Sequence, residues 1–150
     1  MKKASSLITD NISEVLVKII EFTKARHEII SENLSKTEEP DFVPRDLAVE
    51  EFSGLLQSAL NEHIQNRRIV LFDSENIKFD VNSRFKVKAI ADTYAKELFE
   101  KNKDEYIKLQ VSKLMENSLN HKVAAEILRQ KKCSEINVPN TEKRLPEESH

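Results

Sequence analysis

Gly54 is the only glycine among the 150 residues of this chain. Glycine is the usual residue of tight hairpin turns, of loops that cradle phosphate groups and of left-handed helix ends. The chain has neither a G-x-G-x-x-G pattern nor a P-loop pattern, so its sequence gives a nucleotide-binding fold no support. We therefore expect a protein built mainly from long helices without interruptions.

The length of the chain suits one ordinary domain and is too short for two. Apolar residues make up 39% and charged residues 33% of the chain, a balance typical of amphipathic helices and short of that of disordered proteins. We expect residues 1–133 to form a single unit. Residues 134–150 contain Pro139, Pro146 and many charges, so we predict a disordered tail there.

A long helix is predicted near the start of the chain. From Leu7 to Leu34 the apolar residues alternate in steps of four and three, which places them on one helix face. Arg26 occupies one of the expected apolar positions, and no glycine or proline interrupts the segment. The pattern predicts a helix of about seven turns at roughly 3.6 residues per turn. The apolar positions are Ile8, Ile12, Val15, Ile19, Phe22 and Ile29.

A second long amphipathic helix is predicted over residues 107–128. Its heptad pattern contains Ser118 and His121 at two apolar positions, so a strict coiled coil is not required. Beside that pattern lies a row of apolar residues at four-residue steps, which makes the apolar face broad. The two helices can bury their apolar faces together or against neighbouring subunits. The second row consists of Met115, Leu119, Val123 and Ile127.

The middle of the chain is expected to contain a shorter helix and irregular segments or short strands. Prolines in residues 35–45 predict a loop that ends the first helix. Asp46 is a plausible N-cap for a helix over residues 47–63. Runs of apolar or alternating residues at 69–72 and 85–89 favour short strands, and residues 90–101 can again form a helix. The predicted fold class is mainly α.

Charge and cysteine content exclude several classes of function. The net charge of −2 supplies no field for binding nucleic acid or an anionic membrane. No stretch approaches the roughly 20 apolar residues that a membrane-spanning helix needs, so we expect no direct membrane insertion. Cys133 is the only cysteine, so one chain can build neither a disulfide nor a site with several thiolate ligands.

Candidate catalytic and metal sites are also weak. His27 and Glu28 begin like the zinc-binding helix motif, but Ser31 stands where the second histidine is required. Cys133 follows two lysines with no apolar pocket indicated around it, which favours an incidental thiol over a nucleophile. His121 is best interpreted as a hydrogen-bonded core or interface residue. The sequence therefore predicts no enzyme activity, no cofactor and no metal.

The end of the first predicted helix carries a resemblance to a known family. Residues 26–35 and the segment that follows resemble the flagellar axial proteins, and the flagellar basal-body rod protein FlgB family most closely. In that family the segment reads NxANxxTPGY, and Asn33, Pro40 and the aromatic Phe42 match it here. Arg45 and Asp46 resemble the Arg-Asp-apolar step that follows. Lys36, Glu39 and Asp41 depart from the family pattern.

The predicted C-terminal helix adds to this resemblance. Residues 114–121 resemble the family's C-terminal stretch, in which Asn117 follows an acidic turn and Leu119 supplies an apolar position. The resemblance covers roughly residues 12–64 and 102–131. It implies assembly roles for Asn33, Pro40, Phe42, Asn117 and Leu119.

Membership of this family would imply a structural subunit of the proximal flagellar rod, exported without a cleaved signal peptide and located in the periplasmic part of the basal body. The start of the chain agrees with this expectation, because Asp10 and Glu14 interrupt what would be the apolar core of a signal peptide. The implied partners are other rod and basal-body proteins and further copies of the chain. The alternative is a soluble helical adaptor with no flagellar role.

Overall fold

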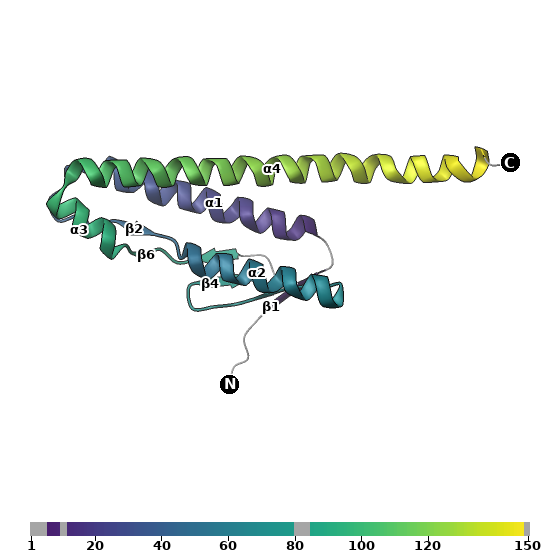
Figure 1. Ribbon diagram of the computed structural model, residues 1–150, viewed down its shortest axis with the longest axis horizontal. Coiled ribbons are helices and arrows are strands. Elements are labelled where there is room, and N and C mark those ends of the chain that lie inside the picture. The colour runs from purple at the N-terminus through teal and green to yellow at the C-terminus, as the bar shows by residue number, and fades with distance from the viewer. Residues whose placement is uncertain (1–5, 10–11, 80–84, 149–150) are drawn as a thin grey trace, which may run out of the picture.

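The computed structural model describes residues 6–9, 12–79 and 85–148. The described chain is mainly helical, with long helices towards both ends and short strands between them, as the sequence predicts. Figure 1 shows α4 along one edge of the molecule, with α1 beside it, and α2 and the strands on the opposite side of α1. The helices are α1 (Ile12–Ser35), α2 (Val49–Asn66), α3 (Thr93–Lys101) and α4 (Lys103–Glu148).

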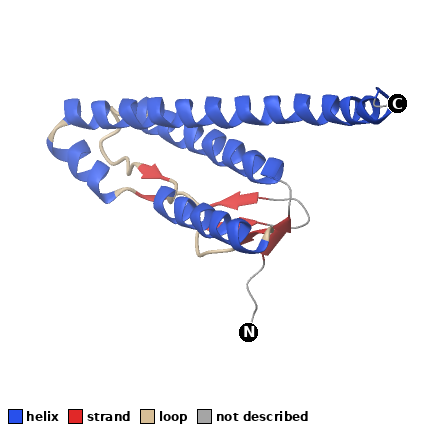
Figure 2. Ribbon diagram, turned by 45° about the vertical axis from the view of Figure 1, so that its right-hand side comes forward, coloured by secondary structure: helices blue, strands red, loops and turns tan. Residues whose placement is uncertain are grey.

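The strands form three separate antiparallel pairs, β1 with β3, β2 with β6 and β4 with β5. They lie between and beside the helices in Figure 2. The two strands predicted from residues 69–72 and 85–89 are confirmed as β3 and β5. The bounds are β1 (Ser6–Thr9), β2 (Arg45–Asp46), β3 (Ile69–Phe72), β4 (Ile77–Phe79), β5 (Phe85–Val87) and β6 (Ile90–Ala91).

The apolar face of α1 is covered by the middle of the chain. Phe22 stacks on Phe52 of α2 with ring centroids 4.0 Å apart, and Phe52 lies 6.1 Å from the ring of Phe85. Burying large aromatic side chains is a major source of folding free energy. The main core therefore lies between α1, α2 and the strands. Its buried members are Phe22, Leu47, Phe52, Ala59, Ile69, Leu71, Ile77 and Phe79.

A smaller core joins α3 to the start of α4. Phe99 and Tyr106 pack edge to face with their ring centroids 5.0 Å apart. Asp92 caps α3 by accepting a hydrogen bond from the backbone N–H of Ala95. Asn102 ends α3 and caps α4, since its side chain accepts from the backbone N–H of Glu105. These caps fix the corner at which the chain turns into α4.

The prediction that Asp46 caps the helix over residues 47–63, which is α2 in the structure, is wrong. The helix begins at Val49 after Ala48, whose side chain makes no capping hydrogen bond. Asp46 instead lies in β2, where Arg26 and Lys113 bind its carboxylate. Charge-assisted hydrogen bonds to Arg26 and Lys113 are strong, so the Asp46 carboxylate binds these two side chains and does not cap the helix.

The predicted start of the first helix is also corrected. Residues Ser6–Thr9 form β1, with Leu7 opposite Leu71 and Ile8 opposite Val70 of β3. Pairing with this buried strand satisfies backbone groups that a helix would otherwise satisfy internally. The helix therefore begins at Ile12, and the apolar position assigned to Ile8 does not belong to it.

The ends of α4 and α2 have particular features. The sequence predicts a disordered tail over residues 134–150, and the disorder of this segment stays a prediction; α4 is assigned as far as Glu148. Arg67 ends α2 in the left-handed conformation, with φ 61° and ψ 28°, at a position where glycine is usual.

Candidate functional site

The face of α4 that packs on α1 is largely polar. Asn117, 2% exposed, donates a hydrogen bond of 2.7 Å to the backbone carbonyl of Thr23. The Thr23 hydroxyl lies 2.9 Å from Nδ1 of His121, so the interpretation of His121 as a hydrogen-bonded interface residue is confirmed. Hydrogen bonds between buried groups demand particular positions, so they fix how the two helices pair.

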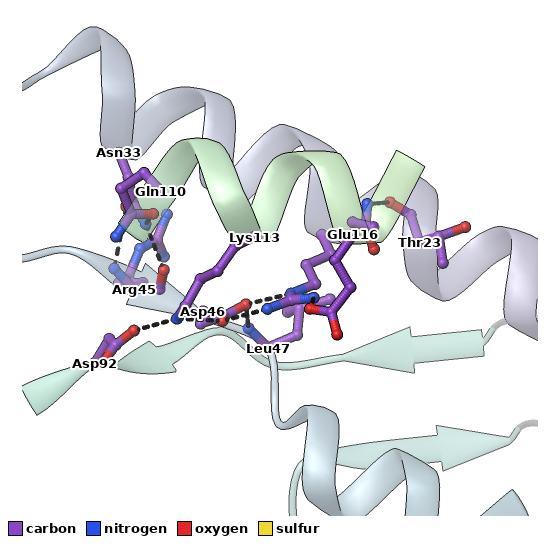
Figure 3. Close-up of polar contacts among 11 residues, drawn as sticks. Thr23, Asn33, Arg45, Asp46, Leu47, Asp92, Gln110, Lys113 and Glu116 are labelled. Atoms are coloured by element: carbon purple, nitrogen blue, oxygen red, sulfur yellow. Dashed lines mark hydrogen bonds and ion pairs between the residues drawn. The ribbon is translucent and has the colours of Figure 1, made fainter. Parts of the chain in front are cut away.

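Asn33 forms the junction at the other end of this helix pair. Its side-chain oxygen accepts from the backbone N–H of Arg45 at 3.1 Å. Its Nδ2 donates to the Arg45 carbonyl at 2.7 Å and to Oε1 of Gln110 at 2.9 Å, and Figure 3 shows this cluster. The hydroxyl of Tyr106 donates to the backbone carbonyl of Asn33. One asparagine thus ties α1, β2 and α4 together.

Burial changes the acidity of the tyrosine at this junction. Tyr106 is fully buried, and burial, followed by the negative charge of Asp92, raises the pKa of its hydroxyl to about 12. The neutral hydroxyl is the hydrogen-bond donor that Asn33 needs. The junction therefore keeps its donor throughout the neutral pH range.

A buried ion network connects four elements between the two helix-pair contacts described above. Arg26 on α1 binds both oxygens of Asp46, with nitrogen-oxygen distances of 2.8 and 3.0 Å. Lys113 on α4 lies 2.8 Å from Oδ2 of Asp46 and 2.6 Å from Oδ2 of Asp92 (Figure 3). Asp92 is also the cap of α3. The network holds α1, β2, α3 and α4 in one arrangement.

The two charged groups at the centre of the network have shifted acidities. Burial raises the pKa of the Asp46 carboxyl, but hydrogen bonds from Arg26 and Lys113 and their positive charges outweigh it, so the pKa lies below its ordinary value. Burial lowers the pKa of Lys113, but the hydrogen bonds and charges of Asp46 and Asp92 outweigh it, and the pKa is raised. Both groups are thus held in their charged forms.

The five residues implied by the family resemblance do not meet in one place. Asn33 and Asn117 are both buried at the helix pair, where they bind different parts of the neighbouring chain. Phe42 packs edge to face against Phe99, with centroids 6.1 Å apart, and so belongs to the smaller core. Pro40 lies on the exposed loop. Leu119 is 62% exposed, on the opposite side of α4 from Asn117.

The outward side of α4 carries a stripe of exposed apolar side chains. Each member follows the previous one by four residues, so the row winds slowly around the helix. Met115 and Leu119, the most exposed at 67% and 62%, lie in the middle of the row. We call this row the outward stripe. Its members are Ile107, Val111, Met115, Leu119, Val123 and Ile127.

The histidine, acidic and cysteine residues considered as candidates in the sequence lie on α1 and α4. In the described part of the chain, no three histidine, cysteine, aspartate or glutamate side chains are grouped to hold a metal ion. A hollow of about 410 Å³ between α1 and α4 is lined by His27, Glu28 and His121. His27 and Glu28 are exposed there. Cys133, also on α4, is exposed.

No helix in the described segments combines the length and apolar character needed to cross a membrane. No protein-family model, curated protein or solved structure matches this chain.

Sequence reasoning missed most of the residues that hold the helix pair. Only Arg26 could have indicated this network from the sequence, because a charged residue at an apolar position of a helix face needs a charged or hydrogen-bonding partner when it is buried. Lys113 and Gln110 carried no comparable signal. Gln110 is fully buried, and its position in the sequence did not distinguish it from a surface glutamine.

Proposed function

We propose that this chain is a structural subunit of an assembly, and that the assembly is the proximal rod of the bacterial flagellar basal body. The observation that carries the proposal is the outward stripe of α4. It exposes six large apolar side chains in one row, and exposed apolar patches of this kind mark surfaces that associate with other proteins.

The construction of the helix pair supports this proposal. Polar contacts of Asn33, Asn117 and Lys113 attach α4 to the rest of the molecule. Of the larger aliphatic side chains that the structure describes on residues 103–134 of this helix, most remain exposed. A helix that only completed its own domain would turn those side chains inward. This arrangement leaves α4 able to contribute apolar surface to a neighbour.

The flagellar assignment rests on the resemblance of residues 26–46 and 114–121 to the FlgB family. Asn33, which matches the family pattern, is a residue whose loss would disturb three elements at once. The soluble adaptor would share the stripe but would not occur in basal bodies.

The test is quantitative mass spectrometry of hook and basal-body particles purified from the source cell. Tagged wild-type chain is expected in amounts comparable with those of other rod proteins. Leu119→Lys, which puts a charge into the outward stripe, is expected to reduce its amount in particles at least tenfold, a loss of about 1.4 kcal/mol of association energy. Val43→Lys is the matched control, because Val43 is an apolar residue outside α4 that is 44% exposed.

Absence of the wild-type chain from intact particles would overturn the flagellar assignment. Equal amounts of wild type and Leu119→Lys in particles would overturn the role of the stripe in that assembly. Circular dichroism of both purified variants checks that the helical fold is retained.

A further inference from the structure

The outward face of α4 has an internal symmetry centred on Asn117. Met115 and Leu119 lie two residues before and after this position, and Val111 and Val123 lie six residues before and after it. Ile107 and Ile127 complete the series at ten residues on either side. The stripe therefore presents nearly the same side chains when it is read from either end.

Two opposite charges follow the same symmetry. Lys108 lies nine residues before Asn117 and Glu126 nine residues after it. Their separation of 18 residues is five full turns at 3.6 residues per turn, so both project in the same direction. That direction falls between those of Met115 and Leu119. The centre of the outward face thus reads positive, apolar, apolar, negative along the helix.

We propose that two copies of this chain pair through the outward face of α4, with the two helices antiparallel about a twofold axis that passes opposite Asn117. In this pairing Met115 of each copy meets Leu119 of the other, and Lys108 meets Glu126. A parallel pairing in register would set Lys108 against Lys108 and Glu126 against Glu126. The charge pattern therefore selects the antiparallel arrangement.

The shape of the surface suits this partner. Rows of side chains at four-residue steps form ridges that can pack into the grooves of a neighbouring helix. Two hollows, of about 410 and 330 Å³, share Met115 as a wall and lie along the stripe. An isologous interface needs such self-complementary ridges and hollows on a single surface.

Existing contacts of the two charged residues do not prevent this pairing. Lys108 is 3.6 Å from Glu105, and the two side chains are 73% and 52% exposed. Glu126 is bound by Arg129, with side chains 50% and 63% exposed, and accepts a hydrogen bond of 3.0 Å from Gln130. Exposed pairs three residues apart on a helix contribute little free energy. Both residues can therefore turn to a partner at small cost.

Sedimentation velocity of the purified full-length chain, with Cys133→Ser in every sample to prevent disulfides between chains, tests the proposal. The parent is expected to form dimers as its concentration rises. Leu119→Lys is expected to raise the dimer dissociation constant at least tenfold, whereas Val43→Lys leaves it unchanged. A parent that stays monomeric at its highest soluble concentration would overturn the proposal.

Charge exchange tests the orientation of the two helices. Lys108→Glu and Glu126→Lys each turn two attractive contacts into repulsive ones, so each is expected to raise the dissociation constant on the order of tenfold. The double variant restores opposite charges across an antiparallel interface and is expected to return to the parental value. A double variant as weak as the single ones would overturn the antiparallel arrangement.

This inference concerns the same face as the proposed function, but the two fail separately. Dimerisation is measured on purified protein, whereas the rod assignment is measured in basal-body particles. A dimeric chain absent from particles would leave the interface in place and remove the flagellar role. A monomeric chain present in particles would do the reverse.

Discussion

Lys113 Nζ, on α4, lies 2.8 Å from Oδ2 of Asp46, on β2. The same nitrogen lies 2.6 Å from Asp92, which caps α3. A lysine that is only 19% exposed thus links three elements that are far apart in the sequence. Its contacts explain why α4 remains attached to the molecule through a face with few large aliphatic side chains.

Replacing this lysine should weaken the fold. Lys113→Met keeps the length of the side chain but leaves the carboxylates of Asp46 and Asp92 without their shared donor. We expect a loss of about 1–3 kcal/mol in the free energy of unfolding, measured by urea denaturation. Lys122→Met is the matched control on the exposed side of α4 and should change stability by less than about 0.5 kcal/mol. Equal effects of both variants would contradict the structural role of Lys113.

Acid should destabilise the protein through Asp46. Because the folded-state pKa of this carboxyl is lowered, its contribution is present above the unfolded-state pKa of about 3.9 and is lost as the pH falls through the folded-state value. In urea denaturation measured from pH 6 downward, the free energy of unfolding should begin to fall once the pH is below about 3.9, the unfolded-state pKa. Asp46→Asn should be less stable at neutral pH and have a shallower acid limb. An unchanged limb in this variant would exclude Asp46 as its source.

Asn33→Ala should destabilise the helix pair. The substitution leaves the backbone N–H and carbonyl of Arg45 and the side chain of Gln110 without their Asn33 partner. Buried polar groups that lose their partners cost about 1–3 kcal/mol each, so we expect a loss of about 2–4 kcal/mol in thermal or urea unfolding. Asn120→Ala, at an exposed position of α4, is the control. A loss no greater than that of the control would show that the junction is dispensable.

The hydroxyl of Tyr106 should ionise at a higher pH than that of an exposed tyrosine. The chain has two tyrosines, so Tyr94→Phe leaves Tyr106 as the only source of tyrosinate absorbance. The midpoint of that titration should lie at a pH of about 12, because ionisation places a charge in a buried site and removes the donor to Asn33. Its raised pKa also means that its contribution to stability is lost as the pH rises above about 10, the unfolded-state value. A midpoint near that unfolded value in the folded chain would contradict the burial of Tyr106.

Arg67→Gly should stabilise the protein. Arg67 has a positive φ of 61°, and a left-handed backbone costs an L-residue about 1–2 kcal/mol. Glycine avoids this cost but gains freedom in the unfolded chain, so we expect a net gain of about 0.5–1 kcal/mol in thermal unfolding. Arg68→Gly should lower stability, because this neighbour lacks the positive φ and loses an ion pair with Glu62. A loss of stability in Arg67→Gly would contradict the strain at this helix end.

The position and type of most elements followed from the sequence. The scarcity of glycine predicted long helices, and the apolar pattern predicted α1 and α4 as well as the strands at residues 69–72 and 85–89. Local pattern was a poor guide where a distant partner competed with it. Asp46 became an ion partner rather than a cap, and Ser6–Thr9 became a strand because β3 pairs with it.

The sequence by itself determined that α1 and α4 are amphipathic, because periodicity fixes the angular position of each side chain around its own axis. Only the tertiary structure decided which side of each helix is covered. It buries the apolar side of α1 against the middle of the chain and the Asn117 side of α4 against α1. Periodicity does not tell which part of the chain covers a helix face. That depends on contacts between residues far apart in the sequence, such as Arg26 and Asp46, which no local pattern specifies.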